Sequence, residues 1–293
     1  MTILECAPAR AVSRRPIRRL PAGAVDCHFH VFGPQDRFPY ASGRSYTPPD
    51  ASIGDYEVLA EMLGFSRAVI VQPSVYGLDN SRTLSFLYES RIPARAVLVL
   101  DPSVSENELE ALHESGVRGV RLNLVFAAGL AMTAAAGLAD KIRDLGWHLQ
   151  FLADVSQIED LKALVSRLDI PIVFDHLGHV PVERGVHNRG FQDLLGLVRD
   201  GRAWVKMTGA YRVTAMQTPP YDDAAPFVEA LLKTGPGQLV TGTDWPHPSI
   251  TVPVPDDTDL MDMFGSWVGD AELRQKIFVE NPERLYGFDA WPT

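Results

Sequence analysis

Short apolar runs rich in β-branched residues alternate with amphipathic stretches along most of the chain. The runs have the length and composition of strands, whereas the stretches repeat apolar residues at the three- and four-residue spacing of a helix face. The pattern predicts eight strands, at 24–30, 67–72, 95–100, 117–123, 146–152, 171–176, 203–208 and 238–243. It predicts helices at 55–64, 80–91, 105–115, 132–145, 156–168, 190–200, 222–234, 256–266, 270–279 and 281–286.

Strands separated by helices favour parallel βαβ repetition. An open, doubly wound sheet usually carries a glycine-rich phosphate-binding sequence after its first strand, but here that position reads Val-Phe-Gly-Pro at 31–34. Eight strands fit a closed (β/α)8 barrel, the TIM-barrel fold, better than an open sheet. In such a barrel the active site lies at the C-terminal ends of the strands.

The chain reads as one domain with a short basic extension. Its 293 residues suit either two ordinary domains or one large barrel, and no linker rich in Pro, Gly or Ser divides it. We expect a single barrel domain over 21–293 and a flexible arm over 1–20. The arm has a net charge of +4, which leaves −14 on the remainder, so we expect it to be attracted to the acidic body.

Charge and cysteine content narrow the choice of partners and compartment. A net charge of −10 argues against nucleic acid as the main partner, and no apolar run is long enough to cross a membrane. Cys6 and Cys27 are the only cysteines, so we do not expect a disulfide framework. We expect a cytoplasmic location. Homo-oligomer formation is left open.

Polar residues recur where a barrel would place catalytic groups. His28 and His30 alternate on the first strand and therefore share a face, His176 follows the sixth strand, and Asp244 follows the eighth. A carboxylate that ends an apolar strand needs a buried partner, so we expect these four side chains to converge at the barrel mouth. His148, on the fifth strand, is expected to face the helical layer.

These groups suit hydrolysis of a carbonyl compound. Asp244, with an ordinary pKa of about 4, is ionised at neutral pH and can take a proton from water. The three histidines can supply donors or a cation to an oxyanion, and Arg121 and Arg212 can hold a carboxylate. No Gly-x-Ser-x-Gly sequence supplies a serine nucleophile. The sequence therefore predicts a hydrolase acting on a small, acidic, carbonyl-bearing molecule.

Three motifs resemble the amidohydrolase superfamily, in its branch of 2-pyrone-4,6-dicarboxylate lactonases and related sugar-acid or muconolactone lactonases. They are His-Phe-His at 28–30, Asp-His-Leu-Gly-His at 175–179 and Gly-Thr-Asp-Trp-Pro-His-Pro at 242–248. The resemblance implies that the three histidines bind or polarise a lactone carbonyl and that Asp244 activates water. The expected substrate-binding residues are Ser74, Tyr76, Arg121, His179, Arg212 and His247.

The chain also departs from the pattern of the pyrone-dicarboxylate enzymes. Ala127 and His179 stand where those enzymes carry arginine, and Ser249 stands where they carry asparagine. Loss of two arginines argues against a planar dicarboxylate as substrate. We therefore expect a lactone with fewer or different anionic groups, such as a sugar-acid lactone or a substituted muconolactone.

The resemblance leaves two metal states open. The fourth strand ends in Arg-Leu-Asn at 121–123, without the lysine that binuclear members use, so two metals are not expected. One divalent ion, Zn²⁺ above all, could be held by His28, His30, His176 and Asp244. No metal at all is the other option, favoured by the resemblance, because a lactone is an activated ester.

Other functions would give distinct results. A mononuclear zinc-dependent decarboxylase of aromatic acids would release CO₂, and a lactone isomerase would produce no acid. A non-catalytic carboxylate-binding protein would bind ligand equally well after Asp244→Asn and show no turnover. The presence of a base together with donor groups favours the lactone hydrolase over these alternatives.

Overall fold

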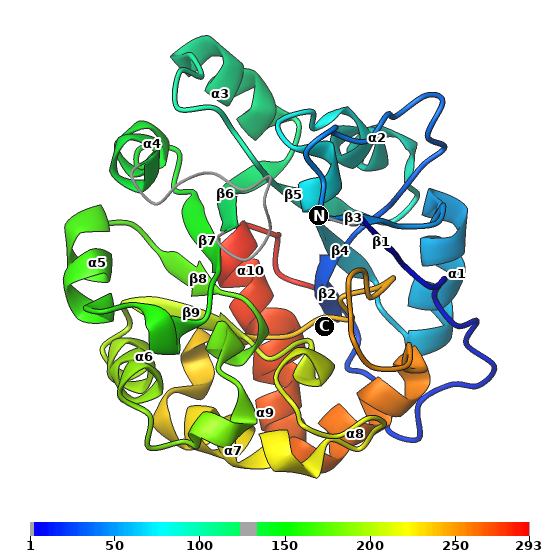
Figure 1. Ribbon diagram of the computed structural model, residues 1–293, viewed down its shortest axis with the longest axis vertical. Coiled ribbons are helices and arrows are strands. Elements are labelled where there is room, and N and C mark those ends of the chain that lie inside the picture. The colour runs from blue at the N-terminus through cyan, green and yellow to red at the C-terminus, as the bar shows by residue number, and fades with distance from the viewer. Residues whose placement is uncertain (1–2, 124–133, 293) are drawn as a thin grey trace.

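The central sheet of the computed structural model contains eight parallel strands in a single ring (Figure 1). The structure describes residues 3–123 and 134–292. Each strand pairs with the next in chain order, with no crossover between neighbours. The strands are β2 (Val25–Phe29), β4 (Arg67–Val71), β5 (Ala94–Leu98), β6 (Val117–Asn123), β7 (His148–Leu152), β8 (Ile172–Phe174), β9 (Ala203–Lys206) and β10 (Leu239–Val240).

Main-chain hydrogen bonds close this sheet between its first strand and the segment after its last. Cys27 N donates to Thr241 O (3.0 Å), and Asp244 N donates to His28 O (2.7 Å). His30 N donates to the carbonyl oxygen of Trp245 (2.8 Å). The (β/α)8 barrel predicted from the sequence is therefore confirmed. The seam between β2 and β10 lies beside the two histidines and the aspartate.

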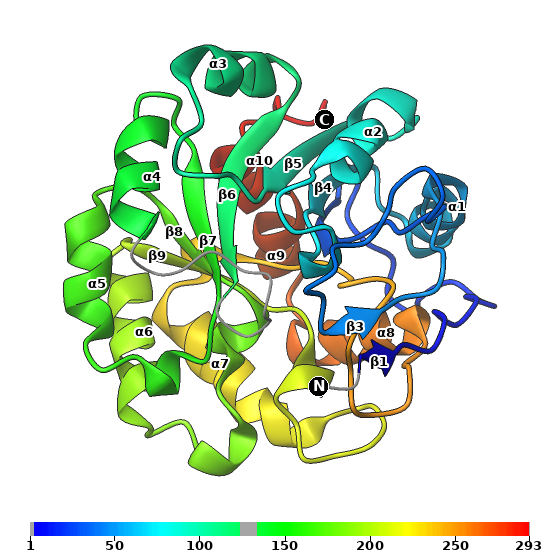
Figure 2. The same ribbon diagram turned by 45° about the horizontal axis from the view of Figure 1, so that its top comes forward.

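Helices form the outer layer around the barrel (Figures 1 and 2). Most begin with a side-chain cap, such as the reciprocal Ser52–Asp55 capping box of α1. The helices are α1 (Ile53–Leu63), α2 (Ser81–Glu89), α3 (Glu106–Glu114), α4 (Ala135–Ile142), α5 (Leu161–Leu168), α6 (Arg189–Arg199), α7 (Ala225–Thr234), α8 (Asp257–Trp267) and α9 (Ala271–Gln275), and α10 (Asn281–Tyr286), outside this layer, ends the fold. A π-helical turn, Lys276–Glu280, joins the last two.

The interior of the barrel is closed at one end by α10, which lies across its centre in Figure 1. Tyr286 of α10 is fully buried and packs with Val25, Cys27 and other inward-facing strand residues. The ring of His148 lies 5.3 Å from that of Tyr286, centroid to centroid. The expectation that His148 faces the helical layer is therefore wrong. The phase of β7 places His148 and Gln150 inside the barrel.

The seam provides a first test of the fold. A Cβ atom on Gly242 would lie 2.5 Å from both Asp26 Oδ1 and His28 N, so Gly242→Ala must push β2 and β10 apart. We expect the free energy of unfolding to fall by about 1–3 kcal/mol, the usual cost of overpacking. Urea denaturation measures the change. Gly137→Ala is the matched control, because nothing lies within 4 Å of its Cβ and alanine favours a helix; equal stability changes in the two variants would contradict the prediction.

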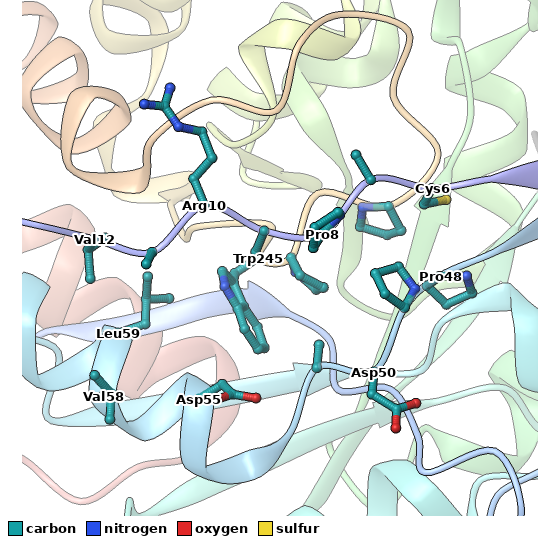
Figure 3. A pocket seen from close by; sticks show the side chains of 17 residues that line it. Cys6, Pro8, Arg10, Val12, Pro48, Asp50, Asp55, Val58, Leu59 and Trp245 are labelled. Atoms are coloured by element: carbon teal, nitrogen blue, oxygen red, sulfur yellow. The ribbon is translucent and has the colours of Figure 1, made fainter.

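Residues 3–20 run along the outside of the barrel. β1 (Leu4–Glu5) pairs in parallel with β3 (Tyr46–Thr47), and Arg14 forms ion pairs with Asp259 and Asp262 of α8, each at 2.6 Å. Figure 3 shows the segment between Cys6 and Val12 crossing a pocket into which Trp245 points. The arm thus contacts the segment that follows β10. Among the described residues, no helix is long and apolar enough to cross a membrane.

Candidate active site

A β-bulge in β2 turns the paired histidines inward. The register with β4 shifts between Asp26 and Phe29. Phe29 then faces the helices, where its ring stacks on Tyr56 of α1 at 3.6 Å. His28 and His30 face the barrel interior, with ring centroids 5.0 Å apart. The bulge therefore lets one short strand present an apolar side chain to the helices and two imidazoles to the barrel interior.

Asp244 and His176 come from the turns after β10 and β8. Both adopt left-handed backbone angles, with φ of 61° and 49°, a conformation unfavourable for a side chain and typical of functional sites. Asp244 Oδ1 lies 3.7 Å from Nε2 of both His28 and His30, and Asp244 Oδ2 lies 4.0 Å from His176 Nδ1. All four side chains are buried. The structure thus brings together the four groups that the sequence singles out as catalytic candidates.

The other oxygen of Asp244 is fixed by the turn after β9. Tyr211 donates its hydroxyl hydrogen to Asp244 Oδ2 (2.6 Å), and Arg212 Nε donates to the same oxygen (2.6 Å). His247 lies behind Tyr211, with its Nδ1 2.7 Å from the hydroxyl and its Nε2 3.1 Å from Asp257 Oδ1. Asp244 is therefore oriented with Oδ1 toward the histidines, and Oδ1 itself has no hydrogen-bond partner among the described residues.

A second buried carboxylate, Asp175, lies beneath the histidines. Arg121 Nη2 and Gln150 Nε2 donate to Asp175 Oδ2 at 3.2 and 3.1 Å. Asp175 Oδ1 lies 3.3 Å from His28 Nδ1 and 3.8 Å from Lys206 Nζ. Asp175, His28 and Lys206 are each fully buried, so the mutual attraction of the charges must offset a large desolvation cost.

Burial and charge fix the protonation states of the site. Burial lowers the pKa of His28 to about 4, although Asp175 opposes this, and it holds the pKa values of His30 and His176 well below their usual range. Burial would raise the pKa of Asp244, but Arg212 and the histidines hold it well below its ordinary value. The site therefore pairs neutral imidazoles with an ionised aspartate at neutral pH.

Hydrogen-bond partners distinguish the imidazoles. His30 Nδ1 lies 2.7 Å from the carbonyl oxygen of Val71, which can only accept, so Nδ1 carries the hydrogen and Nε2 has a free lone pair. His176 Nδ1 pairs with the Thr208 hydroxyl (2.8 Å), which can donate or accept. Neutral His30 therefore faces Asp244 as an acceptor. This differs from the expectation that all three rings supply donors or a cation.

His30, His176 and Asp244 line a small cavity, whereas His28 is absent from its described lining; only some of the expected substrate-binding residues project into it. Its described lining is His30, Tyr46, Ser74, Arg121, Leu152, His176, Arg212, Asp244 and Pro248. Three expected residues lie outside this lining: Tyr76, whose hydroxyl accepts from Gly33 N (2.9 Å), His179 and His247. Ala127 lies outside the described residues, whereas Ser249 donates its main-chain N–H to Cys6 Sγ (3.3 Å).

Sequence reasoning did not assign roles to several residues at the site. Asp175 and Lys206 were each visible inside strand-end motifs, and alternation along β9 places Lys206 two residues from Thr208 on the inward face. Tyr211 precedes a candidate arginine. Tyr46 carried no signal, because it belongs to a long connection that reaches the cavity only through the fold.

The donor set could hold a metal ion by type, but its charge balance opposes one. His28, His176 and Asp244 each offer a ligand atom within 4.8 Å of the others, and His28 Nε2 and Asp244 Oδ1 are buried without a hydrogen-bond partner in the described part of the chain. However, the carboxylates of Asp175 and Asp244 already face three buried cations, on Arg121, Lys206 and Arg212. A divalent ion would add positive charge to a cluster that has an excess of it.

A closed parallel barrel with a buried aspartate and three imidazoles at its strand ends has the architecture of a barrel enzyme, whose active site lies at that end of the strands. A family model for amidohydrolases matches residues 25–288, and the chain belongs to this family. This finding confirms the resemblance drawn from the three sequence motifs.

Curated relatives and a solved structure agree with the assignment. The chain is 38% identical to a 4-sulfomuconolactone hydrolase of Rhizobium radiobacter, over 97% of each chain. It is 36% identical to a 2-pyrone-4,6-dicarboxylate hydrolase of Comamonas testosteroni, over 95% of this chain and 93% of the relative. A crystal structure of an Agrobacterium tumefaciens protein, 28% identical, superposes with a TM-score of 0.84 and covers 94% of this chain and 100% of its own. The chain therefore falls in the lactone-hydrolase branch of the family.

Proposed function

We propose that the protein hydrolyses a small carboxylated lactone to its open-chain acid. The observation that carries this proposal is Asp244 Oδ1, which has no hydrogen-bond partner within 3–123 and 134–292 and lies 3.7 Å from Nε2 of both His28 and His30, at a cavity also lined by two arginines. A base, imidazoles that can bind an oxygen and a site for an anionic group are thus collected at one place. The hydrolase activities named for the two curated relatives support the same reaction class.

In the first step, Asp244 takes a proton from a water molecule as the water oxygen attacks the lactone carbonyl carbon. His30 Nε2 accepts the second water hydrogen, because its own hydrogen is donated to Val71 O. Tyr211 and Arg212 hold the carboxylate in position through Oδ2. The water is therefore oriented by two acceptors, Asp244 Oδ1 and His30 Nε2.

In the second step, the tetrahedral intermediate collapses and the bond between the carbonyl carbon and the ring oxygen breaks. The negative charge on the carbonyl oxygen is stabilised by hydrogen bonds from His28 and His176. Asp244 returns its proton to the departing ring oxygen, so one water molecule is consumed and the product carries one new carboxyl group. This balance distinguishes hydrolysis from isomerisation, which releases no acid.

Arg121 and Arg212 bind the carboxylate that the substrate already carries. Each guanidinium has five N–H donors. Some of them donate to main-chain oxygens, such as Gln72 O for Arg121 and Pro248 O for Arg212, and the others can donate to a substrate carboxylate. Ser74, which lies in the cavity lining, adds a hydroxyl. His179 and Ser249, where the pyrone-dicarboxylate pattern has Arg and Asn, supply no side chain to the described lining. This supports a substrate with fewer anionic groups than a planar dicarboxylate.

The excess of positive charge at the site supports a reaction that needs no resident metal. If a single divalent ion is held, His28, His30, His176 and Asp244 are its ligands, and the ion would lower the pKa of water to about 7. We expect protein purified without chelator to contain less than one zinc per chain and to keep its activity after dialysis against EDTA. Metal analysis by mass spectrometry checks the first result; activity that is lost to EDTA and restored by Zn²⁺ would contradict the metal-free mechanism.

A panel of lactones tests the function directly. We expect acid release, followed with a pH indicator, from a carboxylated muconolactone or a sugar-acid lactone with a kcat/KM above that for 2-pyrone-4,6-dicarboxylate. A neutral lactone of the same ring size is the matched control, because it lacks the group that the arginines bind. Efficient turnover of the pyrone dicarboxylate would refute the substrate preference. Absence of acid release from every carboxylated lactone would refute the function.

A further inference from the structure

We propose that Lys206 is a positioning residue that sets the tautomer of His28. It donates a hydrogen bond to His28 Nδ1, which leaves the single ring hydrogen of this neutral imidazole on Nε2, on the side of Asp244 Oδ1, 3.7 Å away. The inference deepens the proposed function, because an Nε2–H group is what a lactone carbonyl oxygen requires as its hydrogen-bond donor.

The contacts of Lys206 direct its ammonium group at the back of the ring. The side chain is fully buried inside the barrel, and Nζ donates to Cys27 O and to Gln150 Oε1, each at 2.8 Å. The third contact of Nζ is His28 Nδ1, at 3.3 Å. An ammonium group has three hydrogens and no lone pair, so it can only donate. His28 Nδ1 must therefore accept, and Nε2 must carry the ring hydrogen.

Asp175 is the competing partner, and its geometry is poorer. Asp175 Oδ1 also lies 3.3 Å from His28 Nδ1, and an ionised carboxylate would place the hydrogen on Nδ1 instead. However, the contact between Oδ1 and the ring is a charge contact that does not meet hydrogen-bond geometry among the described residues, whereas the contact between Lys206 and the ring does. Oδ2 is occupied by Arg121 and Gln150. The structure therefore favours the lysine as the partner that determines the tautomer.

The opposite edge of the ring shows the consequence. His28 Nε2 is buried and has no hydrogen-bond partner among the described residues, although Asp244 Oδ1 lies 3.7 Å away. His30 has the reverse arrangement, since its Nδ1 hydrogen is donated to Val71 O. Two adjacent imidazoles thus have opposite tautomers: His28 donates to the carbonyl oxygen, and His30 accepts from water. An Nε2–H group also cannot ligate a metal through that nitrogen.

Nitrogen-15 NMR tests the tautomer in the unmodified protein. In histidine labelled with nitrogen-15, ring nitrogens with and without hydrogen differ strongly in chemical shift, and the His28→Gln variant identifies the signals of residue 28. We expect a protonated Nε2 and an unprotonated Nδ1 for His28, and the reverse for His30. A protonated Nδ1 on His28 in the wild-type protein would overturn the proposal. This measurement needs no substrate, so its failure is separate from failure of the proposed function.

Variants then test the cause. In Lys206→Met we expect the hydrogen of His28 to move to Nδ1, toward Asp175, and kcat to fall about 10²-fold, the usual loss for one oxyanion donor, with KM changing less than threefold. Arg67→Met is the control for loss of a buried cation, because Arg67 binds Gly23 O and Glu283 at the start of β4. It should lower stability and leave the His28 signals unchanged. An unchanged His28 spectrum in folded Lys206→Met would assign the lysine a purely structural role.

Discussion

Replacing Asp244 by asparagine is expected to lower kcat/KM for lactone hydrolysis by about 10³-fold, within the range that loss of a general base produces. The amide keeps the shape of the carboxylate but cannot take a proton from water. Its oxygen can still accept from Tyr211 and Arg212, which now contact Asp244 Oδ2. The change therefore removes the base while keeping the partners that position it. Initial rates of acid release under first-order conditions measure the effect.

Two controls separate the loss of chemistry from a loss of structure. Asp101→Asn removes a carboxylate from an exposed residue after β5 and should leave kcat/KM unchanged. Circular dichroism and the midpoint of urea unfolding should show that Asp244→Asn remains folded. A folded variant that retains more than a tenth of wild-type kcat/KM would show that Asp244 is not the base.

Asp175→Asn is expected to give the largest loss of stability, about 3 kcal/mol in the free energy of unfolding. Asp175 is the carboxylate that lies between Arg121 and Lys206, with His28 against its second oxygen. Neutralising it leaves two cations buried without their countercharge. Urea denaturation followed by tryptophan fluorescence measures the change.

A double-mutant cycle of Asp175→Asn with Lys206→Met isolates the interaction between the Asp175 carboxylate and the Lys206 ammonium group. If the cost of Asp175→Asn comes from uncompensated lysine charge, the double variant should lose at least 1 kcal/mol less stability than the sum of the two single variants. Strict additivity would show that Asp175 and Lys206 contribute independently. The cycle measures stability alone and does not depend on any substrate.

The sequence was sufficient to predict the barrel. The strand predicted at 117–123 is β6 with the same bounds, and the strand predicted at 203–208 contains the shorter β9 (Ala203–Lys206). The observed strands end earlier than predicted for a physical reason. At their C-terminal ends the chain leaves the hydrogen-bonded sheet and presents polar side chains. The sequence does not show this point, because apolar or β-branched residues continue the strand pattern beyond it. The pairing of β1 with β3 was not predicted, because two-residue strands carry no periodic signal.

The site could be predicted only in part. His28, His30 and Asp244 stood out because polar residues at the ends of apolar strands are unusual, and their proximity then followed from the fold class. The inward orientation of His148 and the tautomers of the two β2 histidines depend on contacts with other elements, such as those of His148 with Tyr286 and of His28 with Lys206. Such contacts join residues on elements that do not pair with each other, and one sequence does not reveal their register.

The seam between β2 and the segment after β10 has a consequence for synthesis of the protein. The histidine pair leaves the ribosome with the first barrel strand, whereas Asp244 emerges only after the last one. Until then β2 has an unpaired edge that can associate with other nascent chains. Closure of the barrel therefore pairs the exposed edge of β2 and completes the site in the same event. A nascent chain on a ribosome stalled before β10 lacks Asp244 and still has the unpaired edge, so we expect it to be inactive and prone to aggregation.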